Sequence, residues 1–101
     1  MPTKSYEEEL LEQLKDIGEA AAYLTECFED SEEVFLLGLR NVVEANGGIG
    51  TLSKNTELNR ENLYRTLSES GNPKLSSLAI ILGALGLQLE FAPKDNDQEA
   101  A

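Results

Sequence analysis

Apolar residues recur at helical spacing along most of this chain, and polar or glycine-rich breaks separate the segments. Tyr6, Leu10 and Leu14 are spaced four positions apart, so residues 5–15 are predicted to form an amphipathic helix. Asp16 resembles an N-cap with a glutamate three positions later, which is typical of a capping box. A second helix is therefore expected to follow directly. Its apolar positions are Ala20, Tyr23, Leu24, Cys27 and Phe28.

The next segment, residues 32–45, is predicted to be the central helix of the core. Ser31 precedes two glutamates, and acids in a first turn complement the helix dipole. Apolar residues cover most of the circumference of this helix, as expected for a buried one. Asn and Gly at positions 46–48 favour the left-handed conformation of a helix end. The apolar positions are Val34, Phe35, Leu36, Leu37, Leu39, Val42 and Val43.

Residues 70–73, Ser-Gly-Asn-Pro, are predicted to end the helix that directly precedes them and to lead into the last helix of the chain. Ser76 or Ser77 is expected to cap this last helix, and Gly86 to stop it. Its inward-facing residues are predicted to be Leu78, Ile81, Leu82 and Leu85.

Residues 87–91 change to strict alternation, which predicts a half-buried strand. No other segment alternates in this way, and a lone strand would leave its backbone donors and acceptors unpaired. We expect it to pair with its own copy in a two-fold homodimer, with Leu87, Leu89 and Phe91 as the dimerisation residues. The alternative is a packed C-terminal extension without pairing. Residues 92–101 are predicted to be a disordered polar tail.

Residues 47–67 have the pattern of a helix-turn-helix. A short helix contains Ser53, residues 57–59 form the turn, and a second helix begins at Arg60. Ser53 is small enough to let the two helices approach, and Leu58 and Leu63 are placed to hold them together. One position departs from the usual motif: Glu57 occupies a place normally taken by glycine, so it must adopt a positive φ or use another turn.

The second helix of this pair would present polar residues at its exposed start, where a major groove can be read. Asn59 can cap the helix. Arginine can donate two hydrogen bonds to guanine, and asparagine can bond adenine in a similar way. Thr51, Lys54 and Lys74 are phosphate candidates or ordinary surface residues, and Tyr64 is a DNA contact or a packing residue. The predicted DNA-binding set is Thr51, Lys54, Asn59, Arg60, Asn62, Tyr64, Arg65 and Lys74.

The net charge of −11 would by itself argue against nucleic acid. The distribution changes that conclusion. Residues 1–33 carry eleven acids and two lysines, whereas residues 49–75 carry four cations and three acids. The acidic N-terminal third favours a basic protein partner, since opposite potentials steer association. The alternative is a solvated helix face that aids solubility.

The chain of 101 residues suits one small domain, and its longest apolar run is interrupted by Gly83 and Gly86, so no membrane span is expected. The N-terminus lacks the apolar region of a signal peptide. Cys27 is the only cysteine and is expected to be a packed residue in a reducing compartment. We expect a cytoplasmic protein.

Catalysis is not expected. Histidine is absent, so Cys27 has no histidine partner, and no cluster of cysteine or histidine could hold zinc. The glycine-rich residues 47–50 lack the preceding strand and the Lys-Ser/Thr pair of a phosphate-binding loop. We therefore expect no enzyme activity, no metal and no cofactor.

The block over residues 33–91 closely resembles the HigA-like addiction-module antidote proteins, which carry a Cro/C1-type (XRE) helix-turn-helix. The specific motifs are NRENLYRTLSESGNPKLSSL, at residues 59–78, and ALGLQL, at residues 84–89. DIGEAAAYLTECFED, at residues 16–30, looks like the short helix that precedes the first core helix of the family. The chain departs from the family at Glu57, usually Gly, and at Ser53 and Asn55.

This resemblance implies an all-α fold: a compact helical bundle with a lambda-repressor-like helix-turn-helix. The expected parts are an acidic helix at residues 1–15, a DNA-binding domain at 16–91 and a tail at 92–101. It also implies an antitoxin that silences a small basic RelE-like toxin, which cleaves mRNA, and that represses its own operon as a dimer on operator DNA. The alternatives are a phage-type repressor without a toxin and a module that binds only protein.

Overall fold

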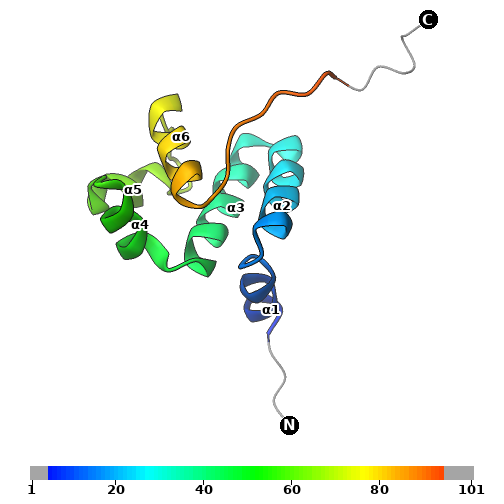
Figure 1. Cartoon of the computed structure of the whole chain (residues 1–101), viewed down its shortest axis with the longest axis horizontal. Helices are drawn as coiled ribbons and strands as arrows, with labels where there is room; N and C mark the ends of the chain where they lie inside the picture. Colours follow the sequence, from blue (N-terminus) through cyan, green and yellow to red (C-terminus); the bar gives the residue numbers. More distant parts are fainter. Residues whose placement is uncertain (1–4, 95–101) are drawn as a thin grey trace, which may run out of the picture.

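A computed structural model describes residues 5–94, and within this range the chain is all-helical. Figure 1 shows the helices in chain order, with α2 and α3 side by side and the shorter α4, α5 and α6 gathered at one end. The helices are α1 (Tyr6–Gln13), α2 (Ile17–Asp30), α3 (Glu32–Ala45), α4 (Gly48–Thr56), α5 (Arg60–Thr66) and α6 (Leu75–Ala84).

Side-chain caps set the starts of the first three helices. Ser5 and Glu8 form a reciprocal capping box at α1. The Asp16 carboxylate accepts from the Glu19 N–H at 3.0 Å, and the Ser31 hydroxyl accepts from the Val34 N–H at 3.0 Å. The sequence predictions of helix starts at Asp16 and Ser31 are therefore confirmed.

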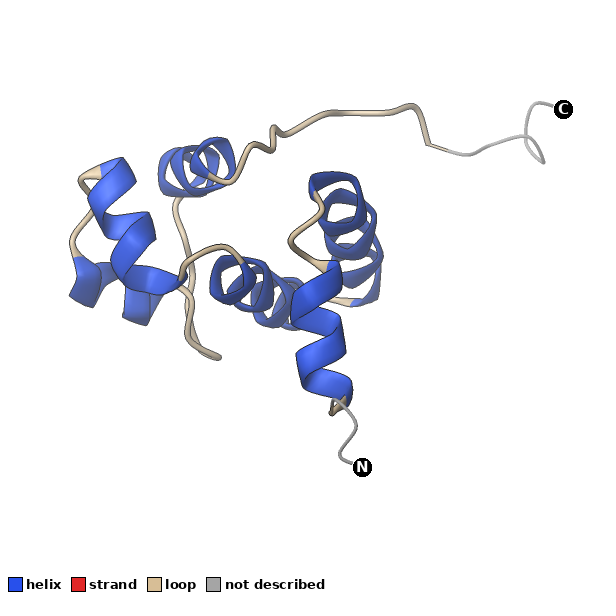
Figure 2. Cartoon of the chain, turned by 60° about the horizontal axis from the view of Figure 1, so that its bottom comes forward, coloured by secondary structure: helices blue, strands red, loops and turns tan. Residues whose placement is uncertain are grey.

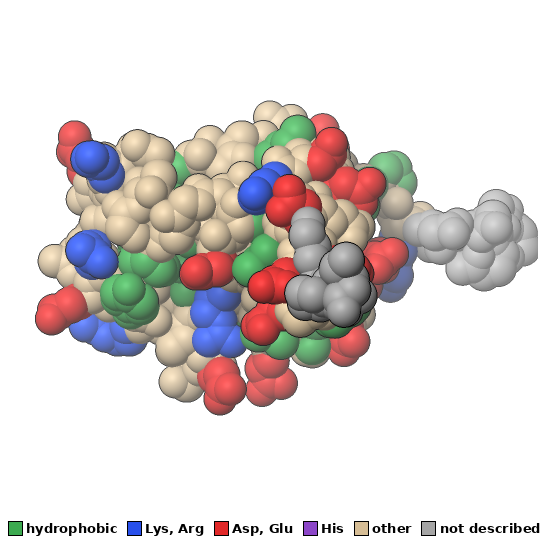
Figure 3. Space-filling model, turned by 90° about the horizontal axis from the view of Figure 1, so that it is seen from below, with side chains coloured by type: hydrophobic (Ala, Val, Ile, Leu, Met, Phe, Trp, Pro, Cys, Tyr) green, Lys and Arg blue, Asp and Glu red, His purple; other side chains and the backbone are tan. Residues whose placement is uncertain are grey.

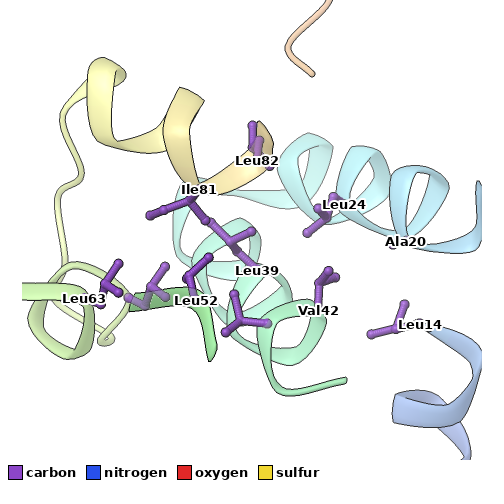
Figure 4. Packing of buried hydrophobic residues seen from close by; sticks show 11 residues of the cluster. Leu14, Ala20, Leu24, Leu39, Val42, Leu52, Leu63, Ile81 and Leu82 are labelled. Atoms are coloured by element: carbon purple, nitrogen blue, oxygen red, sulfur yellow. The ribbon is translucent and has the colours of Figure 1, made fainter. Parts of the chain in front are cut away.

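The core lies where α3 meets the other helices. Leu39 and Val42 of α3 are fully buried, and Figure 4 shows Leu52, Leu63 and Ile81 directed toward this centre from three other helices. This arrangement confirms the predicted central position of residues 32–45. The buried cluster consists of Leu14, Ala20, Leu24, Leu39, Val42, Val43, Leu52, Leu63, Leu67, Ile81 and Leu82.

The α2–α3 pair packs closely because a glycine stands at the contact. A Cβ added to Gly38 would lie 2.7 Å from the Cys27 Sγ, so only glycine fits there at this helix separation. The Asn41 amide also donates to the Tyr23 hydroxyl at 3.0 Å. These contacts hold the acidic helix α2 against the central helix.

The N-terminal segment is joined to the same core. Leu14 is fully buried, and the Asn46 Nδ2 donates both to the Leu14 carbonyl at 3.2 Å and to the Val42 carbonyl at 2.8 Å. One amide thus links the end of α1 to the end of α3, and the acidic helix packs on the domain.

Two expectations differ from the structure. Helix α6 begins at Leu75 after Lys74 as N-cap, so Ser76 and Ser77 lie inside its first turn and cap nothing. Residues 87–91 form no strand within the described part of the chain, where Figure 2 shows a loop leaving α6. A strand needs a paired neighbour, and no other strand is present in the part of the chain that the structure describes.

The C-terminal segment is anchored only at its start. The Leu87 N–H donates to the Leu82 carbonyl at 2.8 Å, and Leu87 packs on the core. Beyond it Leu89 is half-exposed and Phe91 is 97% exposed. The expected polar tail, residues 92–101, lies outside the described residues from position 95 onward.

Candidate nucleic-acid interface

Helices α4 and α5 are joined by a connection of three residues, 57–59, whose geometry is fixed by local hydrogen bonds. Glu57 has φ 64°, the left-handed conformation, and its N–H donates to the Ser53 carbonyl at 2.8 Å. The Ser53 hydroxyl donates to the Leu58 carbonyl at 2.6 Å. Glu57 therefore adopts a positive φ, one of the two possibilities that the sequence left open, and Ser53 closes the turn.

The second helix of the pair is capped and anchored as its sequence predicts. The Asn59 side chain accepts from the Asn62 N–H at 3.1 Å. Leu63 is buried, and Leu58 packs against the core from the turn. These contacts hold α5 by one apolar side and leave its polar side in solvent.

The residues expected to contact DNA are all exposed at this end of the molecule. Tyr64 is 58% exposed, so it is not a packing residue of the core. Arg60, Asn62 and Arg65 lie on the solvent side of α5, within one and a half turns of its start. The exposed set consists of Thr51, Lys54, Asn59, Arg60, Asn62, Tyr64, Arg65 and Lys74.

Within residues 5–94, the cations of this surface have no carboxylate partner. Among residues 5–94, neither Arg60 nor Arg65 lies within 4.0 Å of an acidic side chain, and the same holds for Lys54 and Lys74. The Arg60 guanidinium lies beside Gly50, 3.8 Å from where a Cβ of that residue would stand. Arg60 of α5 thus reaches α4 at Gly50.

A pocket of about 500 Å³ continues this surface from α5 to the start of α6. Arg65, Asn62 and Lys74 supply cationic and amide groups to it, and its lining contains no acidic residue. The loop that forms the pocket depends on Gly71, because a Cβ there would collide with the Thr66 carbonyl oxygen. Sequence patterns placed Lys74 near this surface but gave no signal for the pocket, which arises from the path of the loop.

Comparison with known proteins identifies the family. The family described as probable addiction module antidote protein matches residues 4–93. The chain belongs to this family. An uncharacterized protein of Haemophilus influenzae (strain ATCC 51907 / DSM 11121 / KW20 / Rd) is 31% identical over 91 residues, which cover 80% of this chain and 93% of the relative. No solved structure matches.

Membership of the antidote family implies a cognate toxin as partner. The sequence resemblance to addiction-module antidotes is confirmed at this level. The narrower assignment to HigA-like proteins with an XRE-type motif stays a prediction.

The surface of the antidote protein is divided by charge. Figure 3 shows most acidic side chains on the side that carries α1, whereas the side of α4 and α5 carries several basic side chains together with fewer acidic ones. In α1 and α2 the acids are exposed, and Phe28 is 61% exposed beside them. Its ring packs edge-on against Phe35 at a centroid distance of 5.5 Å. The surface of α1 and α2 therefore combines negative charge with an accessible aromatic ring.

The single cysteine of the antidote protein is a packed residue, as expected. Cys27 is buried, and this burial raises the pKa of its thiol. Burial likewise raises the pKa of the neighbouring Tyr23. A thiol held in its protonated form is a poor nucleophile.

None of the helices within residues 5–94 has both the length and the apolar character needed to cross a bilayer.

Proposed function

We propose that this antidote protein is an antitoxin that binds operator DNA as a dimer through α4 and α5, and that it neutralises a small basic, RelE-like toxin. One observation carries the DNA-binding part. In a chain of net charge −11, the solvent side of α5 presents two arginines and an asparagine without carboxylate partners in the described residues.

In the proposed complex α5 enters the major groove as the second helix of a helix-turn-helix. Arg60, Asn62 and Arg65 read base edges, and Tyr64 contacts the base or sugar surface beside them. Thr51 and Lys54 of α4 and Lys74 at the start of α6 bind phosphates, and Lys74 acts with Arg65 at the pocket between α5 and α6. Asn59 caps the reading helix and fixes its start.

Arg60→Ala tests this assignment. We expect it to weaken binding to the DNA upstream of its own gene by about 1–3 kcal/mol and to relax sequence preference. Lys15→Ala is the matched control, because it also removes one positive charge but lies after α1 on the opposite side of the molecule. Fluorescence anisotropy with labelled DNA measures both variants. Equal affinities for Arg60→Ala and the wild type would refute the reading role.

Salt dependence separates DNA binding from a module that binds only protein, the alternative that the net charge of −11 favours. The affinity for upstream DNA should fall steeply as ionic strength rises, because each phosphate contact releases counterions. If the wild-type chain did not bind DNA even at low salt, DNA binding would be refuted and the module that binds only protein would be the remaining function.

The toxin-binding part of the proposal rests on the charge division. A basic toxin would be attracted to the acidic surface of α1 and α2, and Phe28 offers an aromatic contact within it. The chain itself contributes no catalytic step in this proposal; it acts by covering the toxin.

Charge reversal tests this surface. The double variant Glu26→Lys/Glu29→Lys changes two exposed positions of α2, and we expect it to weaken binding to the purified product of the adjacent gene at least tenfold. The control Glu57→Lys/Glu61→Lys makes the same change in charge on the α4–α5 side. Isothermal titration calorimetry would refute the assignment if both double variants lost the same affinity. An adjacent gene product that does not bind the wild type would favour a phage-type repressor without a toxin.

A further inference from the structure

Helix α6 has an unusual surface for a helix on the outside of a strongly charged protein. Its buried side is formed around Ile81 and Leu82, yet its solvent side is apolar too, with Leu75 71% exposed and Ile80 45% exposed. A helix that is apolar all round is normally covered on all sides. Residues 75–89 contain no charged residue.

The solvent side of α6 is continuous along the helix. At 100° per residue, the exposed positions fall within one half of the circumference, opposite the buried positions. Gly83 lies near the middle of this half, and a Cβ added there would meet no atom within 4 Å. We name this surface the α6 face; it consists of Leu75, Ser76, Ala79, Ile80, Gly83 and Ala84.

We propose that the α6 face, together with residues 87–91, binds a second copy of this chain. This inference deepens the dimer of the proposed function by naming the helix that the two copies share. The lack of charge on the α6 face favours a second copy of the chain over a basic toxin as its partner. Two molecules of net charge −11 repel each other over most of their surfaces, and they can approach where charge is absent. A basic partner has no electrostatic attraction to an uncharged face and is attracted instead to α1 and α2.

Size shows why both elements are needed. A helix of 10 residues is about 15 Å long and about 10 Å wide, so one side of α6 is far smaller than the roughly 800 Å² that each partner buries in a standard interface. Residues 87–91 add a segment about 16 Å long when extended, which carries the exposed side chains of Leu89 and Phe91. Beyond the Leu87 N–H, its backbone groups make no backbone hydrogen bond within residues 5–94. A two-fold axis would let each element contact its own copy.

The test is a glutamate at the centre of the α6 face. Gly83→Glu has open space on its own chain and replaces a poor helix former, so the fold is expected to be retained. In the dimer the side chain and its charge would face the copy. We expect the dimer dissociation constant to rise at least tenfold in sedimentation velocity of the full chain across a concentration series. Far-UV circular dichroism checks that helical content is unchanged.

Two further variants make the result decisive. Ala79→Glu changes the same face one turn earlier and should weaken the dimer similarly, whereas Ala22→Glu adds the same charge to the exposed side of α2 and should not. Dimers that persist in both Gly83→Glu and Ala79→Glu overturn the inference, as does a wild type that stays monomeric at every concentration. If the wild type were monomeric and Gly83→Glu abolished toxin binding, the α6 face would be the toxin-binding surface.

The DNA-binding proposal fails separately. Arg60→Ala leaves the α6 face unchanged, so this variant should remain a dimer while losing affinity for DNA. A dimer that dissociates on Gly83→Glu but never binds DNA would uphold this interface and refute the DNA-binding part of the proposed function.

Discussion

The conformation of Glu57 leads to a prediction that reverses the usual effect of glycine. Glu57 ends α4 with φ 64°, and it is the only residue other than glycine with a positive φ within residues 5–94. The left-handed conformation costs a residue with a Cβ about 1–2 kcal/mol. Glycine adopts this conformation freely, but it also makes the unfolded chain more flexible, which lowers the gain in stability by about 0.4–1 kcal/mol. Glu57→Gly should therefore raise the free energy of unfolding by about 0.5–1 kcal/mol.

Thermal unfolding followed by circular dichroism measures this gain. At about 2.1 cal/mol/K of unfolding entropy per residue, a chain of 101 residues should gain about 2–5 °C in Tm. The hydrogen bond from the backbone N–H of residue 57 to the Ser53 carbonyl is kept in the variant, so the relief of backbone strain accounts for the change.

Two controls separate strain from the other effects of the substitution. Glu57→Gln removes the charge but keeps the Cβ, so it should leave Tm nearly unchanged. Glu61→Gly makes the identical replacement at an ordinary helical position of α5, where glycine should lower stability by about 0.5–1 kcal/mol. If Glu57→Gly lowered Tm as Glu61→Gly does, the argument from backbone strain would be refuted.

Three other predictions concern packing and titration. Leu63→Ala should lower the free energy of unfolding by about 2–5 kcal/mol in urea titration, whereas Tyr64→Ala, next to it but exposed, should change it by less than about 0.5 kcal/mol. Gly71→Ala should cost at least about 2 kcal/mol in the same assay, because its Cβ would collide with the Thr66 carbonyl oxygen; a neutral result would contradict the loop geometry. Burial raises the pKa of Cys27, so native thiol should react slowly with iodoacetamide, and stability should decline as pH rises above the ordinary thiol pKa. Mass spectrometry measures the rate of alkylation. Alkaline denaturation curves of the wild type and of Cys27→Ala measure the effect of pH on stability, and identical curves for the two would refute the contribution of the thiol.

The helices could be predicted because their determinants are local. Asp16, Ser31 and Asn59 each cap a helix through a hydrogen bond to an N–H three residues later, a contact within one turn that the sequence displays directly. The start of α6 was predicted wrongly for a related reason. Ser76 and Ser77 are good caps, but the chain is already helical from Leu75, so their hydroxyls fall inside the first turn.

The remaining features depend on contacts between distant segments. The bonds from the Asn46 amide to Leu14, the place of the Arg60 guanidinium beside Gly50 and the pocket at Gly71 have no periodic signature in the sequence. The same holds for the edge contact of Phe28 with Phe35, which leaves the Phe28 ring accessible. Alternation over residues 87–91 indicates an extended backbone, but pairing also requires a neighbouring strand, and residues 5–94 contain none.

The Asn46 side chain joins two segments that lie 32 positions apart in the sequence. It is the last residue before the turn into α4, and its amide holds one carbonyl from the N-terminal helix and one from the central helix. A ligand that moved α1 away from the core would break the hydrogen bond between the Asn46 amide and the Leu14 carbonyl. The Asn46 side chain, which directly precedes Gly47, could then reorient. Binding at the acidic side of the molecule and the turn that leads into α4 therefore depend on one shared side chain.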